Sequence, residues 1–176
     1  MKITIFGMAG TGTSSTGKML AEKLNYPFIS GGDIARMTAE ELGMTLNQID
    51  MLSKTEKKYD LMRDERLREF GNTNPNFVMD ARLGWYNVPD SLKIKLFCSN
   101  EVRIKRIMIR ENKSIEQVTK ETIEREGAIR ERFKAYYDLD FDYETRDEVF
   151  DLVIDTGLHN LEEVIKLSLE LVASKS

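Results

Sequence analysis

Residues 7–15 combine glycines with hydroxyl side chains in an order suited to holding phosphate. Glycine lets the backbone curl so that several N–H groups converge on one anion, and the amino end of a following helix adds positive potential. In the pattern GxxxxGK followed by Ser or Thr, Gly7, Gly12 and Ser14 match, and Thr13 stands where the lysine belongs. The segment therefore predicts a loop that holds a nucleotide triphosphate without the usual ammonium group.

Two other interpretations of this segment have to be weighed. Without its lysine, the pattern also fits a tight turn between a strand and a helix that binds nothing. A second placement of the pattern, from Gly12 to Lys18, contains the lysine but ends in Met19 and starts well after the strand. Residues 16–24 already have the spacing of a helix, so we reject this placement. We expect Lys18 to lie further up that helix, out of reach of the phosphates.

The elements that position this loop follow from the apolar pattern. Five short runs rich in Ile, Val and Phe are expected to form buried strands, because they mostly do not alternate. They are residues 2–6, 26–30, 77–79, 92–98 and 151–155. Helices are expected over residues 13–25, 32–42, 53–70, 100–111, 115–137 and 161–173. This alternation indicates an α/β fold with a five-stranded parallel sheet covered on both faces, whose ligands bind at the carboxyl ends of the strands.

Charged residues follow the second and third strands, at the edge where the phosphate loop is also expected. After the second strand, the paired glycines Gly31 and Gly32 allow a ligand to approach the backbone closely. Asp33 can cap the helix that follows, and Arg36 lies one turn into that helix. After the third strand, Asp80 stands where a P-loop fold commonly holds the magnesium shell, and Arg82 suits bidentate contact with a phosphate. Either arginine alone would fit a solvated surface charge. Two of them at strand ends that face one pocket indicate a second phosphate site.

Residues 103–134 hold many arginines between the fourth and fifth strands. Arg106 and Arg110 are four residues apart and share a helix face, and Arg125, Arg130 and Arg132 follow. The interspersed glutamates fit a solvated amphipathic surface. They fit equally well a mobile helical pair that closes as a lid over a bound nucleotide, excludes water and brings guanidinium groups to a transferring phosphoryl group.

The composition limits the class of protein. A length of 176 residues with 41% hydrophobic residues suits one globular domain. The net charge of -4 argues against nonspecific binding to nucleic acid, and no apolar run approaches the roughly 20 residues of a membrane span. The amino end lacks a signal-peptide layout and Cys98 has no disulfide partner, so we expect a cytoplasmic protein. No Cys/His cluster suggests zinc, and we expect no chemical role for Cys98 or His159.

At this point the segments resemble the nucleoside monophosphate kinases, and among them most closely the archaeal-type cytidylate kinases. The resemblance runs in order over nearly the whole chain. It is carried by residues 7–15, 30–36, 80–82, 101–107, 132–137 and 150–156. Several blocks at matching spacing are far more specific than the glycine loop alone.

The resemblance implies a three-layer P-loop kinase fold in a single domain over residues 1–176. Its core would comprise residues 1–30, 74–112 and 148–176, with a helical NMP-binding lobe over about 31–73 and a helical lid over about 113–147. The implied reaction is transfer of the ATP γ-phosphoryl group to CMP or dCMP, which gives ADP and the diphosphate. The implied ligands are ATP as donor, Mg²⁺ and small nucleotides, without nucleic acid or membrane, and we expect a monomer.

The resemblance also implies roles for individual residues. ATP would be bound by Gly7, Met8, Ala9, Gly10, Thr11, Gly12, Thr13, Ser14, Ser15, Arg106 and Arg110. The acceptor would be bound by Ser30, Gly31, Asp33, Arg36, Asp60, Arg63 and Arg82. The arginines expected to act on the transferring group are Arg36, Arg82, Arg125, Arg130 and Arg132. Ser14 and Asp80 would hold magnesium, Asp80 through water. Asp60, Arg63 or Asp64 would read the cytosine, and a solvated helix face is the competing interpretation of these three.

Two departures from the family pattern keep rival functions open. Thr13 replaces the loop lysine, and Ala81 stands where the third-strand motif often has glycine. The missing lysine would suit a nucleotide-binding regulator that has lost catalysis. Rival enzymes are kinases for AMP, UMP, dephospho-coenzyme A or shikimate, although Asp33, Arg36 and Arg82 fit a phosphorylated acceptor better than shikimate. A plain scaffold domain would leave the arginines at the strand ends unexplained.

Overall fold

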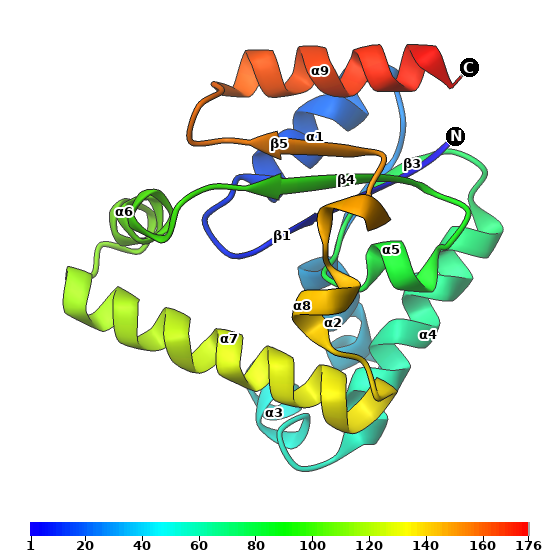
Figure 1. Cartoon of the computed structure of the whole chain (residues 1–176). Coiled ribbons are helices and arrows are strands. Elements are labelled where there is room, and N and C mark those ends of the chain that lie inside the picture. Colours follow the sequence, from blue (N-terminus) through cyan, green and yellow to red (C-terminus); the bar gives the residue numbers. More distant parts are fainter. Residues whose placement is uncertain (176) are drawn as a thin grey trace.

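The computed structural model describes residues 1–175 and is built around one five-stranded sheet (Figure 1). The strand order is β2-β3-β1-β4-β5, and every neighbouring pair is parallel. The strands are β1 (Lys2–Gly7), β2 (Phe28–Ser30), β3 (Phe77–Asp80), β4 (Leu92–Phe97) and β5 (Leu152–Asp155). The predicted five-stranded parallel sheet is confirmed, and the carboxyl ends of its strands lie at one edge.

Helices connect the strands and cover both faces of the sheet, which confirms the three-layer α/β fold (Figure 1). The longer helices are α1 (Thr13–Leu24), α2 (Gly31–Glu41), α4 (Lys57–Thr73), α6 (Asn100–Glu111), α7 (Ile115–Tyr137) and α9 (Leu161–Ser174). The shorter ones are α3 (Leu46–Leu52), α5 (Gly84–Asn87), α8 (Phe141–Glu144) and the 3₁₀ turn η1 (Asp147–Val149). In Figure 1, α1 and α9 lie above the sheet, and the long helix α7 runs along the bottom of the view.

One face of the sheet packs against α1 and α9. Ile3 and Ile5 of β1 and Ile94 of β4 are completely buried on this face. They join Leu20 of α1 and Val164 of α9 in one apolar cluster. Burying each such side chain contributes roughly 1.5–3 kcal/mol. This layer therefore fixes the position of α1, and with it the loop that precedes α1.

The opposite face of the sheet carries two apolar clusters. Phe77 of β3 packs with Leu67, which attaches α4 to the sheet. Phe6 of β1 stacks on Phe150 with ring centroids 5.3 Å apart, and Phe133 of α7 belongs to the same cluster. The carboxyl half of α7 is therefore anchored to the core, although the helix lies far from the sheet along much of its length.

The helix predicted over residues 53–70 is present as α4, which begins at Lys57, and α3 was not predicted. The structure has α3 over Leu46–Leu52, then a turn, and then α4 over Lys57–Thr73. Thr55 donates its hydroxyl to the carbonyl oxygen of Leu52 at 3.3 Å. Hydroxyl side chains compete in this way with helical hydrogen bonds, which favours a turn over a continuous helix.

Strand β2 begins later than predicted, at Phe28. Asn25 ends α1 in the left-handed conformation, with φ of 54°. Pro27 has no N–H, so it enters the ladder only as an acceptor, from the Val78 N–H at 2.9 Å. The single-turn elements α5, α8 and η1 were not predicted, because one turn is too short to show a helical period.

Candidate functional site

A cleft of about 720 Å³ opens at the carboxyl edge of the sheet. Its walls are the segments that follow β1, β2 and β3, together with side chains from α4, α6 and α7. These segments are distant in sequence, and the topology brings them together because β1 lies between β3 and β4. Open parallel sheets bind their ligands at this position.

The loop after β1 requires glycine at two positions. Gly10 has φ of 87° and Gly12 has φ of 93°, in the left-handed region that L side chains rarely adopt. At Gly10, a Cβ atom would also lie 2.8 Å from the carbonyl oxygen of Arg103. Helix α1 begins directly after Gly12, with no side-chain cap and no acidic residue in its first turn. Its first N–H groups are therefore left for an anion.

Side-chain donors from later in the chain bind the carbonyl oxygens of this loop. The carbonyl oxygens of residues 9–11 accept hydrogen bonds, in that order, from Arg103 at 3.2 Å, Arg106 at 3.3 Å and Thr156 at 2.9 Å. Arg106 also donates to the hydroxyl and the carbonyl oxygen of Thr156, at 2.9 and 2.6 Å. These bonds engage three carbonyl oxygens of the loop within the protein. The N–H of Thr11 donates to the Met8 carbonyl oxygen at 3.2 Å, and the other N–H groups of the loop form the polar surface suited to a phosphate.

Ser14 and Asp80 bring two oxygen ligands together between α1 and β3. The Ser14 hydroxyl donates to Oδ2 of Asp80 at 2.5 Å. Burial raises the pKa of Asp80, and hydrogen bonds from Ser14 and Thr13 oppose that shift. A carboxylate beside a hydroxyl offers the hard oxygen ligands that Mg²⁺ takes, with the remaining positions left to water and phosphate. The pair fits such an ion, and within residues 1–175 no group of three or more His, Cys, Asp and Glu side chains forms an all-protein metal site.

Arg36 is oriented by the cap of α2. The Ser30 hydroxyl accepts a hydrogen bond from the N–H of Asp33 at 3.1 Å, and the Asp33 carboxylate accepts from the Ser30 N–H at 2.8 Å. The same carboxylate accepts from Arg36 at 2.5 Å. The Ser30 hydroxyl also donates to Oδ2 of Asp33 at 2.6 Å, and this bond is the largest cause of the lowered pKa of Asp33. Asp33 therefore acts on the cleft through Arg36, which lines it.

Arg82 lies in the cleft among other cations. Within residues 1–175, its guanidinium group makes no hydrogen bond and no ion pair. Burial, together with the charges of Arg125 and Arg132, lowers the pKa of Arg82 to about 10. A cation that is short of solvent and crowded by like charges is stabilised by an anionic ligand.

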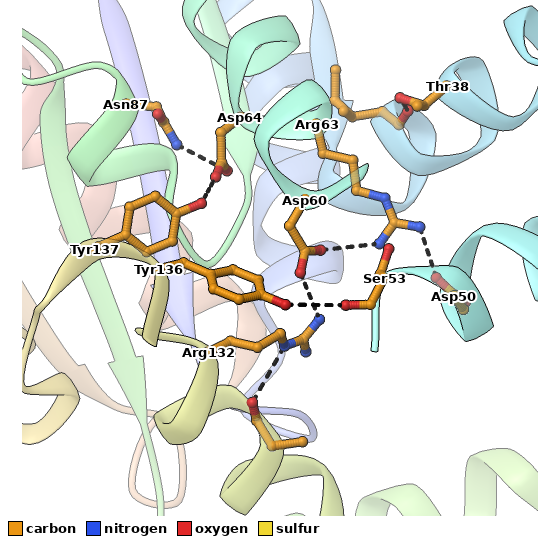
Figure 2. Close-up of polar contacts among 12 residues, drawn as sticks. Thr38, Asp50, Ser53, Asp60, Arg63, Asp64, Asn87, Arg132, Tyr136 and Tyr137 are labelled. Carbon is orange, nitrogen blue, oxygen red and sulfur yellow. Dashed lines mark hydrogen bonds and ion pairs between the residues drawn. The ribbon is translucent and has the colours of Figure 1, made fainter. Parts of the chain in front are cut away.

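Figure 2 shows a network of charged and polar side chains where α4 faces the carboxyl end of α7. Arg63 donates to Asp50 at 2.8 Å and lies 3.8 Å from Asp60. Arg132 of α7 reaches the same Asp60 carboxylate at 3.5 Å. Burial raises the pKa of Asp60 in spite of both guanidinium groups. One carboxylate is thus shared between a cation of α4 and a cation of α7.

Asp64 is a second buried carboxyl group in this network. It accepts hydrogen bonds from the side-chain amide of Asn87 at 3.2 Å and from the hydroxyl of Tyr137. Burial raises the pKa of Asp64 to about 7, although the charge of Arg68 opposes the shift. Near neutral pH the group therefore populates both protonation states, whereas an ordinary aspartate would be ionised.

Buried polar atoms without a hydrogen-bond partner gather in the same region of the described chain: Ser53 Oγ, Asp60 Oδ2 and Arg63 Nε. Leaving such an atom unpaired costs roughly 1–3 kcal/mol. Asp60 and Arg63 both line the cleft. A ligand that brings a donor to the carboxylate and an acceptor to the guanidinium would recover part of this cost.

Helix α7 turns one face toward the cleft. The lining residues of this face recur at helical spacing: Arg125, Ile129, Arg132, Phe133 and Tyr136. Arg130 is turned about 140° from Arg125 around the helix axis. Its guanidinium donates to Asp142 at 3.1 Å and lies over the ring of Phe141. The structure therefore does not bring Arg130 into the cleft, in contrast to the expectation from sequence.

Most of the predicted site residues line the cleft together. Besides Arg130, the residues that do not are Thr11 and Asp33. Thr11 is buried behind the loop, where its hydroxyl donates to the carbonyl oxygen of Met8 at 2.8 Å. Thr11 therefore helps to set the shape of the loop. Asp33 helps to orient Arg36.

Sequence reasoning missed lining residues that are apolar or aromatic: Ile34, Leu67, Leu83, Ile129, Phe133, Tyr136 and Tyr137. The helical spacing of residues 125–136 held a signal for Ile129, Phe133 and Tyr136, because they share a face with Arg125 and Arg132. Nothing in the local sequence marks the others as different from core residues.

Residues expected to have no part in the site lie outside it. Lys18 is exposed on α1 and does not line the cleft. Cys98 is buried, and His159 lies at the surface 3.7 Å from Glu163. Among the described residues, no helix has the length and apolar character needed to cross a membrane.

Comparison with known proteins places this geometry among kinases. A family model described as the cytidylate kinase-like family matches residues 2–158. The chain is 35% identical over 175 residues to the cytidylate kinase of Methanosphaera stadtmanae, with 99% of each protein covered. It is 35% identical over 176 residues to the cytidylate kinase of Archaeoglobus fulgidus, with 99% of this chain and 96% of the relative covered. The solved structure of a shikimate kinase from Bacteroides thetaiotaomicron matches with a TM-score of 0.66, 16% identity and 98% coverage of both chains, which shows a shared fold.

Proposed function

The chain belongs to the cytidylate kinase-like family, and we propose that it transfers the γ-phosphoryl group of ATP to CMP or dCMP. An oxygen of the acceptor phosphate bonds to the γ-phosphorus atom while the bond from that phosphorus to the β–γ bridging oxygen breaks. The products are ADP and CDP or dCDP. The two nucleotides react directly once they are aligned, so no side-chain nucleophile is needed.

The observation that carries this proposal is the set of guanidinium groups in the cleft. Arg36 of α2, Arg82 after β3, and Arg125 and Arg132 of α7 all line it. Arg82 and Arg125 make no hydrogen bond or ion pair with the described residues. The phosphates of two nucleotides are ligands that such a group of cations is suited to hold. A domain that served only as a scaffold would have no use for this concentration of positive charge.

We assign the donor nucleotide to the loop after β1. The N–H groups of residues 7–15 bind the ATP phosphates at the amino end of α1. Arg106 and Arg110 of α6 lie beside this loop, near the adenine. The loop shape that this requires is already present, because the loop carbonyl groups are engaged by Arg103, Arg106 and Thr156.

We assign the acceptor to the opposite end of the cleft. Arg36 and Arg82 bind its phosphate. Ser30 and Gly31 present main-chain groups to the same phosphate. Asp60 and Arg63 lie where its base would be. A carboxylate accepts from the 4-amino group of cytosine and a guanidinium group donates to its ring nitrogen and 2-oxygen, so this pair suits cytosine in polarity.

Magnesium is part of the proposal. Ser14 and Asp80 would hold the ion, Asp80 through water, and the ion would supply positive charge to the transferring phosphates. The chain's own contribution is to keep both oxygens at one place, through the hydrogen bond of 2.5 Å that joins them.

We further propose that residues 31–73 act as the NMP-binding lobe and residues 113–147 as the lid of a cytoplasmic monomer. Contacts between the two segments support this division. Lys57 Nζ donates to the carbonyl oxygen of Tyr136 at 2.7 Å, and the Tyr136 hydroxyl donates to the carbonyl oxygen of Ser53 at 3.4 Å. Closure of this kind excludes water from the phosphoryl group during transfer.

A panel of acceptors tests the function. Release of ADP from ATP and Mg²⁺ would be followed with CMP, dCMP, UMP, AMP, dephospho-coenzyme A and shikimate. We expect turnover with CMP and dCMP well above that with the other acceptors. ATP binding without turnover on any acceptor would favour the nucleotide-binding regulator. Preferred turnover with AMP, UMP or dephospho-coenzyme A would show that the acceptor is assigned wrongly.

A further inference from the structure

Thr156 follows β5 and lies behind the loop after β1, where it is buried. Its Oγ1 atom accepts a hydrogen bond from Nη1 of Arg106 at 2.9 Å and donates to the carbonyl oxygen of Thr11, also at 2.9 Å. The other acceptor within reach is the carbonyl oxygen of Phe97 at 3.3 Å, which already accepts the main-chain N–H of Thr156 at 2.8 Å. The single hydroxyl proton of Thr156 is therefore directed to the loop.

This hydrogen bond sets the direction of one N–H group of the loop. Because a trans peptide is planar, the carbonyl oxygen of Thr11 and the N–H of Gly12 point in opposite directions. Thr11 is buried behind the loop, whereas Gly12 is exposed and lines the cleft. Within residues 1–175, the Gly12 N–H donates to no acceptor. With the carbonyl oxygen held by Thr156, this N–H points to the space where the ATP phosphates would lie.

The backbone at Gly12 does not fix this direction by itself. Gly12 has φ of 93°, and glycine adopts positive and negative φ about equally well. A half-turn of the Thr11–Gly12 peptide would bring this φ into the negative region. A Cβ atom at Gly12 would meet no other atom within 4 Å, so no neighbour blocks such a turn. The turned peptide would present the Thr11 carbonyl oxygen to the phosphates, which would weaken their binding by repulsion.

The two peptides before it are fixed in other ways. The carbonyl oxygen of Ala9 accepts a hydrogen bond from the buried Arg103 at 3.2 Å. Gly10 is crowded by main chain, since a Cβ atom there would lie 2.8 Å from the carbonyl oxygen of Arg103. The N–H of Thr11 donates within the loop at 3.2 Å. The Thr11–Gly12 peptide differs from both, because its direction depends on one hydroxyl group.

We propose that Thr156 is a positioning residue of the donor site, whose hydroxyl keeps the Thr11–Gly12 peptide turned so that its N–H binds the triphosphate. This inference deepens the proposed function and rests on the binding of ATP by residues 7–15. Thr13 stands where P-loops have lysine, so main-chain N–H groups supply a larger share of the phosphate contacts. Thr156 does not line the cleft and acts through the loop.

Removal of the hydroxyl at nearly constant volume tests the inference. Thr156→Val should lower the affinity for ATP with Mg²⁺, measured by calorimetric titration without an acceptor, by about 10-fold, the upper range for one neutral hydrogen bond. Thr156→Ser keeps the hydroxyl and should bind ATP within about twofold of the wild type, less than the effect of one hydrogen bond. Titration with CMP should give the same affinity in both variants and the wild type, because the hydrogen bond lies at the donor end.

A double-mutant cycle shows whether the effect passes through this peptide. Gly12→Ala favours the turned peptide from the backbone side, because an L side chain disfavours φ of 93° and here meets no neighbouring atom. It should also weaken ATP binding by about 10-fold, the scale of the left-handed penalty for an L residue. In the Gly12→Ala background, Thr156→Val should lower ATP affinity by less than about twofold more, because the two changes turn the same peptide.

Two controls separate this role from general loosening of the fold. Thr145 is also buried, and its hydroxyl donates to the carbonyl oxygen of Phe141 at 2.8 Å, away from the cleft. Thr145→Val should lower the melting temperature and leave ATP affinity unchanged. Inorganic triphosphate has no base, and its affinity, measured by displacement of ATP, should fall in Thr156→Val by the same factor as that of ATP.

Three results would overturn the inference. The first is an ATP affinity of Thr156→Val within about twofold of the wild type, less than one hydrogen bond. The second is additive losses for Thr156→Val and Gly12→Ala. The third is a loss for ATP without a loss for inorganic triphosphate, which would assign the effect to Arg106 instead of the loop. If Thr156→Val does not fold, Gly12→Ala decides, and wild-type ATP affinity in that variant would contradict the role of the peptide.

These titrations need no acceptor, so they distinguish this inference from the proposed reaction. Weaker ATP binding in Thr156→Val, together with no CMP-dependent turnover in the wild type, would contradict the proposed acceptor and support the role of Thr156. A wild-type protein that binds no ATP would contradict both.

Discussion

The two ends of the cleft are built in different ways. The donor end, residues 7–15, presents main-chain N–H groups whose directions follow from two glycines with positive φ. The acceptor end, α3, α4 and the carboxyl end of α7, presents charged side chains such as Asp60 and Arg132 (Figure 2). A main-chain surface depends on local backbone conformation, whereas a side-chain surface depends on packing between distant segments.

The difference extends to electrostatics. At the donor end, the carbonyl oxygens that would repel phosphate are engaged by the protein. At the acceptor end, the half-buried Asp60 and the buried Asp64 have raised pKa values, and Asp60 and Arg63 each have a polar atom without a hydrogen-bond partner. In the proposed function, the donor end would bind a nucleoside triphosphate through preformed main-chain groups, and the charges of the acceptor end would select the second nucleotide. Apart from the arginines expected to act on the transferring phosphoryl group, substitutions at one end should change KM for the nucleotide of that end alone.

The largest effect is expected at Arg82, which lies where the two ends meet. Arg82→Ala should lower kcat by on the order of 10³-fold, because it removes a guanidinium group from the transferring phosphoryl group. Arg132→Ala should act in the same direction. Circular dichroism should show an intact fold, and Arg146→Ala, at an exposed arginine that donates to the Tyr143 carbonyl oxygen, should behave as the wild type. Near-normal turnover in both cleft variants would count strongly against the assignment.

A pair of glycine variants tests whether the donor end depends on backbone shape. Gly10→Ala places a side chain at φ of 87° and against the Arg103 carbonyl oxygen, so ATP affinity should fall by roughly 10- to 100-fold, in line with 1–3 kcal/mol of strain. Gly43 also has positive φ, at 63°, but has open space around it and lies outside the cleft. Gly43→Ala should lower the melting temperature and leave ATP affinity unchanged. Equal ATP affinity in the two variants would contradict a donor site built from main-chain groups.

A third prediction concerns the pH dependence of stability at the acceptor end. The pKa of Asp64 is about 7 in the folded chain, whereas an aspartate in an unfolded chain has a pKa of 3.8. Folding therefore favours the protonated form. The stability gained from that proton is complete below pH 3.8 and is lost as the pH rises through 7. Asp64→Asn cannot lose a proton. The difference in melting temperature between Asp64→Asn and the wild type should therefore increase from about pH 5 to about pH 8. The increase should be roughly 2–4 °C for each kcal/mol of unfolding free energy that the wild type loses over this range.

Melting curves without nucleotide at several pH values measure this difference. Asp50→Asn serves as the matched control, since Asp50 is exposed and pairs with Arg63 at its outer side. A constant difference between Asp64→Asn and the wild type across this pH range would show that Asp64 titrates normally.

The smallest effect is expected at Tyr137, which donates a hydrogen bond to Asp64. Tyr137→Phe keeps the ring contact with Phe133 and removes only the hydroxyl, so KM for CMP should rise about fivefold, the scale of one neutral hydrogen bond. KM for ATP should not change, because the contact lies at the acceptor end. A larger change in KM for ATP than for CMP would contradict the division of the cleft into two ends.

The donor end could be predicted from the sequence because its chemistry is local. Gly7, Gly12 and Ser14 stand within one short segment, and the strand before them and the helix after them have clear apolar patterns. The proximity of Ser14 to Asp80 could be predicted for a related reason. Asp80 follows a buried strand, and the parallel topology places every strand end at the same edge of the sheet.

The acceptor end could be predicted only in part. The turn over residues 53–56 has no Gly or Pro to mark it, so the predicted helix began at Ser53 instead of Lys57. Whether Asp60 faces a cleft or solvent depends on α7, which begins more than fifty residues later and brings Arg132 to it. Arg130 shows the same limit, because composition alone does not tell which arginine of α7 faces outward to Asp142.

The central claim is that this cleft joins two nucleotides for direct phosphoryl transfer. The wild-type protein would be incubated with ATP labelled at the γ-phosphorus, Mg²⁺ and CMP, and the labelled products separated by chromatography. The account predicts label in the β-phosphate of CDP, in equal amount to the ADP formed. Label found in inorganic phosphate with no CDP, or ATP recovered unchanged, would contradict it.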